Sequence, residues 1–128
     1  MATKHKKSTI NISDSWSTSL KPGEVLAKIR SFFVYHNIGY EKLNDQEILG
    51  TQGSSLSTHF FGGWLMSPAN LPKKINIKLK TADHTVKIET RITETLGLEK
   101  MNDSLRGEHE EYFIELLDAL KKEIPPST

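Results

Sequence analysis

The sequence predicts an α+β domain in which a long C-terminal helix covers an antiparallel sheet. Between residues 75 and 92, isoleucine, leucine and valine alternate with charged residues, as in a β-hairpin with one buried face. Between residues 105 and 124, leucine and aromatic residues recur three or four positions apart, as on one face of a helix. A one-faced sheet and a one-faced helix can bury these surfaces against each other.

The size and composition of the chain favour a single domain. Its 128 residues are 36% hydrophobic and 26% charged, which suffices for one core, whereas two domains would each be marginal. We expect this domain to span residues 9–124. The basic tail 1–8 and the proline-containing tail 125–128 are expected to be disordered.

The elements follow in the order β-α-β-β-β-β-β-α, which makes about six strands. Alternating apolar residues predict a first strand at 10–16, and helical spacing predicts a helix from residue 25 to near His36. Two short strands, 40–43 and 46–51, are expected about an Asn44-Asp45 turn. A longer strand at 56–66, the hairpin at 75–92 and the helix at 105–124 complete the order, and Pro125 and Pro126 end the last helix.

The hairpin also allows its register to be predicted. If Asp83 and His84 form the loop, one face pairs isoleucines, leucine and threonine, and the other face pairs Lys78 with Glu89. The expected pairs on the buried face are Ile75 with Ile92, Ile77 with Thr90 and Leu79 with Ile88.

The order of elements and the closing helix resemble a reduced helix-grip domain, the Bet v 1 and START-type architecture in which a curved sheet wraps a C-terminal helix. The resemblance spans roughly residues 8–124. It implies an apolar cavity between sheet and helix, which relatives use for lipids, hormones or polyketides. It implies no catalytic residue.

Charge and composition argue against several classes of partner. Lysine plus arginine (17) nearly balance aspartate plus glutamate (16), so no global field attracts nucleic acid. The basic residues around the hairpin are expected on its outer face, diluted by Glu89 and Glu94 and without interleaved aromatic residues, so we expect a solvated surface. These basic residues are Lys73, Lys74, Lys78, Lys80, Lys87 and Arg91.

The chain has no cysteine, which leaves its redox compartment open. The basic N-terminus is followed by no apolar segment typical of a signal peptide, and no apolar run is long enough to cross a bilayer, so we expect a cytoplasmic protein without a membrane span. The five histidines lack the spacing of a metal pair, and no phosphate-binding glycine motif occurs, so neither a metal nor a cofactor is expected.

Asp14 alternates in phase with Ile12 and Trp16, so it is expected on the inward face of the first strand. We expect it to bond to nearby backbone rather than to act in catalysis. His109 lies at the edge of the helical stripe, where a packed histidine is favoured.

The segment 56–66 carries large apolar groups on both faces of its expected strand. Something must cover the second face: the loop 67–72, the first helix, a second copy of the chain or a ligand. Gly62 and Gly63 would allow a bend there.

The sequence leads us to expect a non-enzymatic module that binds a small apolar or amphipathic molecule between the sheet and the last helix. The expected ligand-binding residues are Thr58, Phe60, Trp64, Thr90 and Tyr112, with walls from Ile77, Ile88 and Leu116. An alternative is a protein-interaction domain, such as a homodimer, that uses a surface of Phe61, Leu65 and Leu71. A third hypothesis, an enzyme, would place Asp14, His59 or His109 in a cleft.

Overall fold

The structure, a computed structural model, describes residues 10–52, 72–95 and 103–127, with the side chains of the last helix described from residue 107 onward. The described elements are five strands and two helices. In chain order they are β1 (Asn11–Thr18), α1 (Pro22–Tyr35), β2 (Gly39–Asn44), β3 (Glu47–Gln52), β4 (Lys73–Ala82), β5 (Thr85–Glu94) and α3 (Asp103–Glu123).

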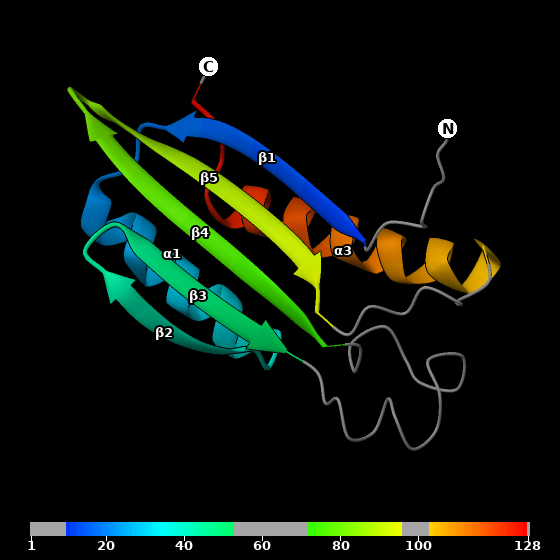
Figure 1. The fold of residues 1–128 in the computed structure, drawn as a ribbon. Coiled ribbons are helices and arrows are strands. Elements are labelled where there is room, and N and C mark those ends of the chain that lie inside the picture. Colours follow the sequence, from blue (N-terminus) through cyan, green and yellow to red (C-terminus); the bar gives the residue numbers. More distant parts are fainter. Residues whose placement is uncertain (1–9, 53–71, 96–102, 128) are drawn as a thin grey trace, which may run out of the picture.

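The five strands form one antiparallel sheet in the order β1-β5-β4-β3-β2. Both helices lie behind the sheet in Figure 1, with α1 behind the β3 and β4 side and α3 behind the β5 and β1 side. The predicted α+β class, with an antiparallel sheet and a closing C-terminal helix, is confirmed. The further strand expected at 56–66 lies outside the described residues.

The predicted register of the long hairpin is confirmed. Ile75 pairs with Ile92, Ile77 with Thr90, Leu79 with Ile88 and Lys78 with Glu89. The chain reverses at Asp83 and His84, where Asp83 has a φ of 47°, a left-handed conformation that aspartate tolerates better than most residues.

The short hairpin turns one residue later than the sequence predicts. Asn44 still belongs to β2 and pairs with Glu47, after a register shift that follows Lys42. The Asn44 side-chain oxygen accepts a hydrogen bond of 2.8 Å from the backbone N–H of Gln46. This side-chain-to-backbone bond stabilises a turn at Asp45-Gln46 instead of the expected Asn44-Asp45.

Helix α1 ends where the sequence predicts, next to His36. Asn37 adopts a left-handed φ of 61°, and its N–H donates to the Val34 carbonyl. The Ile38 N–H donates to the Phe33 carbonyl, which completes the usual two-bond termination of a helix and turns the chain into β2.

The core lies between the sheet and the two helices. Ile75, Ile77, Ile88 and Ile92 of the hairpin are at most 1% exposed, so the apolar face of the sheet is fully covered. At the end of α3, the Trp16 indole N–H donates to the Ile124 carbonyl over 2.9 Å and ties β1 to the helix terminus. The helices contribute Val25, Ile29, Phe32, Phe33, Phe113, Leu116, Leu117 and Leu120 to the same core.

Gly50 marks the closest approach of the sheet to α1. A Cβ atom at this position would lie 2.6 Å and 2.9 Å from two ring carbons of Phe33. We expect Gly50→Ala to lower the free energy of unfolding by about 1–3 kcal/mol, the usual cost of overpacking a core. Urea denaturation measures this loss, and Gly39→Ala on β2 is the matched control because its nearest neighbour is a backbone oxygen 3.9 Å away. Equal losses in the two variants would contradict the close packing at Gly50.

Candidate functional site

Three polar side chains form a row across one end of the sheet. Gln52 ends β3, Lys73 begins β4 and Glu94 ends β5, and the register places Gln52 beside Lys73 and Lys73 beside Glu94. Lys73 and Glu94 are 1% and 3% exposed, although lysine and glutamate are rarely this buried. The row therefore interrupts an otherwise apolar face with two buried ionisable groups.

Helix α3 covers this row. The Lys73 Nζ atom lies 5.2 Å from the centre of the Tyr112 ring and 5.5 Å from that of Phe113. His109, one turn earlier on α3, is fully buried. Figure 1 shows the first turns of α3 projecting beyond the end of the sheet at which β4 begins and β5 finishes. We call Gln52, Lys73, Glu94, His109 and Tyr112 the polar cluster.

Gln52 is the hydrogen-bonding centre of the polar cluster. Its Oε1 atom accepts from the Lys73 amine at 3.0 Å and from the Tyr112 hydroxyl at 3.4 Å. Its Nε2 atom donates to the His36 carbonyl at the end of α1 over 2.8 Å. One half-buried amide thus connects β4, α3 and α1.

Burial changes the acid–base properties of the cluster. It lowers the pKa of the Lys73 amine to about 7, because the apolar surroundings disfavour the charged form. Burial likewise raises the pKa of the Tyr112 hydroxyl, an effect that the bond to Gln52 partly opposes. Near neutral pH, a substantial fraction of Lys73 is therefore an uncharged amine, the form that can act as a nucleophile or base.

Two of the five expected ligand-binding residues lie in the described structure. Tyr112 belongs to the polar cluster. Thr90 is 2% exposed on the buried face of β5, and its hydroxyl has no hydrogen-bond partner among the described residues. Ile77, Ile88 and Leu116 are buried. Thr58, Phe60 and Trp64 lie outside the described residues, as do Phe61, Leu65 and Leu71 of the alternative surface.

The outward placement of Lys73 and Glu94 was wrong. Lys73 precedes Ile75 by two residues and Glu94 follows Ile92 by two, so each shares the buried face of its strand. Alternation along each strand therefore indicates the buried face for both residues, although their charged sequence neighbours are exposed. The other basic residues of the predicted run are exposed as expected: Lys74, Lys78, Lys80, Lys87 and Arg91.

The two candidate catalytic residues that the structure describes, Asp14 and His109, are not brought together. Asp14 accepts a hydrogen bond of 2.8 Å from the backbone N–H of Ser15, as predicted, and its other oxygen lies 2.7 Å from the Lys121 amine. The Lys121 bond lowers the pKa of Asp14. His109 lies twelve residues before Lys121 on α3, about 18 Å along the helix. The burial of His109 agrees with a packed histidine, and His59 lies outside the described residues.

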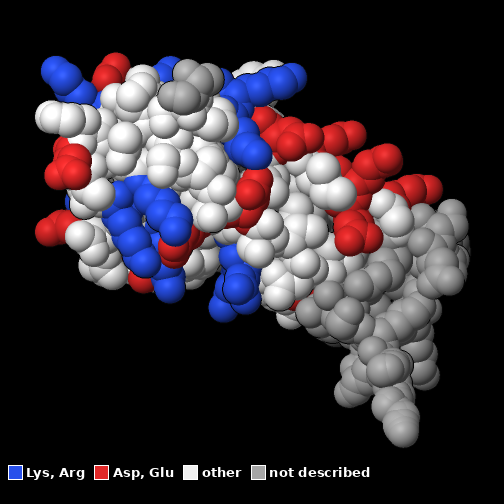
Figure 2. All heavy atoms as spheres, turned by 90° about the horizontal axis from the view of Figure 1, so that it is seen from above, with Lys and Arg blue, Asp and Glu red and all other residues white. Residues whose placement is uncertain are grey.

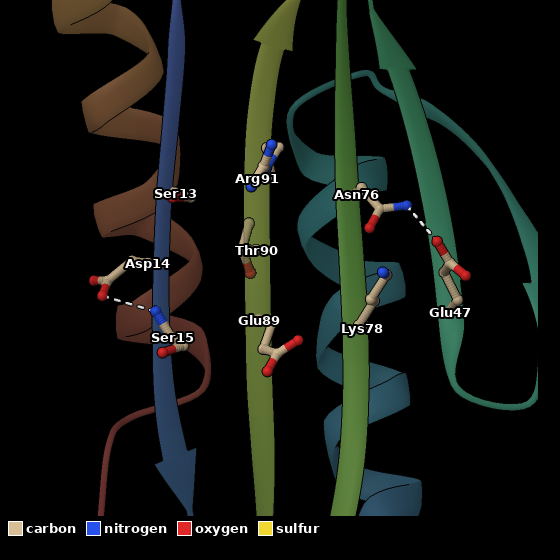
Figure 3. Close-up of a pocket in the computed structure, with 9 residues that line it drawn as sticks. All are labelled: Ser13, Asp14, Ser15, Glu47, Asn76, Lys78, Glu89, Thr90 and Arg91. Carbon is tan, nitrogen blue, oxygen red and sulfur yellow. Dashed lines mark hydrogen bonds between the residues drawn. The ribbon is translucent and has the colours of Figure 1, made fainter.

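A hollow of about 790 Å³ lies on the uncovered face of the sheet (Figure 3). Its side chains are held by hydrogen bonds and ion pairs: Asn76 donates to Glu47 within the hollow over 2.7 Å, and Glu89 lies 3.5 Å from Lys80, which is outside the lining. This surface is open and of mixed charge, whereas the polar cluster combines burial with ionisable groups. The lining residues are Ser13, Asp14, Ser15, Glu47, Asn76, Lys78, Glu89, Thr90 and Arg91.

Charge is unevenly distributed on the face of the molecule drawn in Figure 2. Figure 2 shows acidic side chains gathered along α3, and lysine and arginine gathered toward the other end of the molecule.

Within the described ranges, no group of three histidines or carboxylates is placed to hold a metal ion. Neither described helix combines the length and apolar content that crossing a bilayer would require.

Comparisons with known proteins support the fold alone. No family model matches the chain, and no curated protein matches its sequence. The structure is similar to the crystal structure of protein MLL2253 from Mesorhizobium loti, with a TM-score of 0.54 and 6% sequence identity. This match covers 88% of the present chain and 95% of the other, so nearly the whole fold is shared.

Proposed function

We propose that the protein is a non-enzymatic module that binds a small apolar or amphipathic molecule between the sheet and α3, at the end that holds the polar cluster. The observation that carries the proposal is the burial of Lys73 and Glu94 beneath α3 in an otherwise apolar interface. Burying such groups costs stability, and buried groups with perturbed pKa values cluster at functional sites.

The architecture supports this placement. An antiparallel sheet with β1 beside β5, covered by a long C-terminal helix, agrees with a reduced helix-grip domain. In that architecture a ligand would lie between the sheet and the closing helix. The proposal that this chain is such a domain rests on the order of its elements and on this packing.

The two ends of the interface between α3 and the sheet differ in character. Near the end of α3, Trp16, Leu120 and Ile124 fill the space with apolar atoms. Around the first half of α3, Lys73 and Gln52 lie against aromatic rings. An amphipathic molecule would place its apolar part on Tyr112 and Phe113 and its polar group toward the amine and the amide.

Fluorescence titration with the apolar dye N-phenyl-1-naphthylamine tests this function. We expect saturable binding of one dye per chain, and binding about tenfold weaker in Tyr112→Ala, because the lost ring contact is worth about 1.4 kcal/mol. Ile114→Ala, two residues further along α3 and 44% exposed, should bind as the wild type does. Absence of saturable binding in the folded wild type, or equal losses in both variants, would contradict the proposal.

A protein-interaction domain is the second candidate. The described observation in its favour is that large apolar side chains at the end of α1 and on the edge strand β2 are exposed: Val34 (71%), Tyr35 (84%), Tyr40 (42%) and Leu43 (46%). An open strand edge with apolar neighbours can pair with another chain. A monomer in sedimentation velocity that still binds the dye would argue for the ligand module and against a homodimer.

A further inference from the structure

We propose that the Lys73 amine forms a reversible covalent imine with an aldehyde or ketone group of the bound molecule. The inference rests on the proposed function for delivering that molecule to the polar cluster. It adds the chemical class of the ligand, a carbonyl compound, and the atom that holds it.

The amine is fixed in position rather than free to sample many rotamers. Its Nζ atom donates to Gln52 Oε1 over 3.0 Å, and the rings of Tyr112 and Phe113 border it at 5.2 Å and 5.5 Å. A lysine held this way presents one nitrogen at one place, which favours reaction with a carbonyl group bound beside it.

The surroundings favour the reactive form of the amine. Only an uncharged amine has the lone pair that attacks a carbonyl carbon, and desolvation in an apolar pocket is a recognised way to supply it. Lys73 is 1% exposed, and burial brings its pKa to about 7. Exposed lysines such as the neighbouring Lys74 lack this desolvation.

The step balances without any oxidant or reductant. The nitrogen lone pair forms a bond to the carbonyl carbon, and the carbon–oxygen π pair moves to the oxygen. Transfer of a proton from nitrogen to oxygen gives a carbinolamine. Protonation of its hydroxyl group then lets one water leave as the C=N bond forms, and hydrolysis reverses the sequence.

Titratable groups face the amine from both elements that pack against it. Glu94 occupies the neighbouring position on β5, where its carboxylate would serve as the counterion of a protonated imine. From α3 the Tyr112 ring faces the amine, and its hydroxyl would supply the proton that the dehydration step needs; His109 is buried one turn earlier on the same helix. The polar cluster therefore brings an amine, a counterion and a proton donor together at one end of the fold.

A ligand would have to reach the buried amine by displacing its half-buried neighbours. Gln52 and Tyr112 are both partly exposed, and both bond at the same oxygen that accepts from Lys73. A carbonyl oxygen that displaced the Gln52 amide would take over these two donors. The reacting carbon would then lie beside the nitrogen.

Reductive trapping tests the inference. Wild-type protein is incubated with nonanal and sodium cyanoborohydride near pH 7, and the alkylated residues are identified by peptide mapping. We expect Lys73 to be modified at least about tenfold more than Lys74, because burial lowers the pKa of the Lys73 amine and the polar cluster holds it in one position. Lys73→Arg should lose this adduct and Lys74→Arg should keep it. The α-amino terminus also has a pKa near 8 and is mapped separately.

Competition separates this inference from the proposed function. Addition of 1-nonanol, which has the same chain without a carbonyl, should displace the dye and suppress the Lys73 adduct. If nonanal displaces the dye but leaves no adduct at Lys73, the imine is refuted and the binding module stands. If nonanal neither displaces the dye nor modifies Lys73, both fail. Equal modification of Lys73 and the exposed lysines would also overturn the imine.

Discussion

Replacing Phe113 with alanine lowers the free energy of unfolding by about 3–5 kcal/mol, the usual cost of removing a buried aromatic side chain. Phe113 is 0% exposed and lies on the stripe that joins α3 to the sheet. Its ring also borders the Lys73 amine at 5.5 Å. The loss should therefore combine a cavity in the core with a less ordered polar cluster. Urea denaturation followed by circular dichroism measures it.

The adjacent residue supplies the control for this prediction. Ile114 is on the same helix and 44% exposed, so Ile114→Ala should cost less than about 1 kcal/mol. Similar losses in the two variants would mean that α3 does not pack on the sheet through the Phe113 stripe.

The free energy of unfolding of Lys73→Met minus that of the wild type falls by about 2 kcal/mol as the pH rises from about 7 to about 9, because the wild type gains stability over this range. In the unfolded chain the Lys73 amine has a pKa near 10.4 and is protonated throughout this range. In the folded protein burial lowers its pKa to about 7, so the folded state binds fewer protons and gains stability as the pH rises. Methionine cannot titrate, so the variant lacks this gain.

Chemical denaturation at several pH values checks this prediction. Lys74→Met should show no such trend, because Lys74 is exposed on the opposite face of β4. The ionisable groups placed beside Lys73 are Glu94, its pair partner on β5, and Tyr112 on α3, the helix on which His109 is buried one turn earlier. Burial raises the pKa of Tyr112 above its usual value near 10, so its ionisation falls outside the range. If the difference in the free energy of unfolding between Lys73→Met and the wild type does not change with pH, Lys73 stays charged in the folded protein.

Local pattern predicted the hairpin and the last helix because each obeys a single period. Strict alternation and a two-residue loop leave one register for the hairpin, and the structure has it. The turn of the short hairpin lies at Asp45-Gln46, one residue later than predicted, because the Asn44 side chain accepts a hydrogen bond from the backbone of Gln46. The alternation of apolar and polar residues gives no indication of such a bond.

The candidate site could be predicted only in part. Tyr112 and Thr90 lie on faces that periodicity assigns to the interior, and the structure buries Thr90 fully and Tyr112 partly. The row of Gln52, Lys73 and Glu94 depends on the pairing of three strands, so no local window contains it. The position of Lys73, two residues before Ile75, nevertheless indicates the buried face of β4, although lysine as a residue type favours an exposed position.

The central claim is that a small molecule binds under α3 at the polar end of the sheet. Filtered nuclear Overhauser spectra of the protein with bound N-phenyl-1-naphthylamine test it most directly, because they report which protons lie within about 5 Å of the dye. We predict contacts from the naphthyl protons to the rings of Tyr112 and Phe113 and to the Lys73 methylenes. Contacts confined to the open face, at Asn76 and Arg91, would contradict the claim.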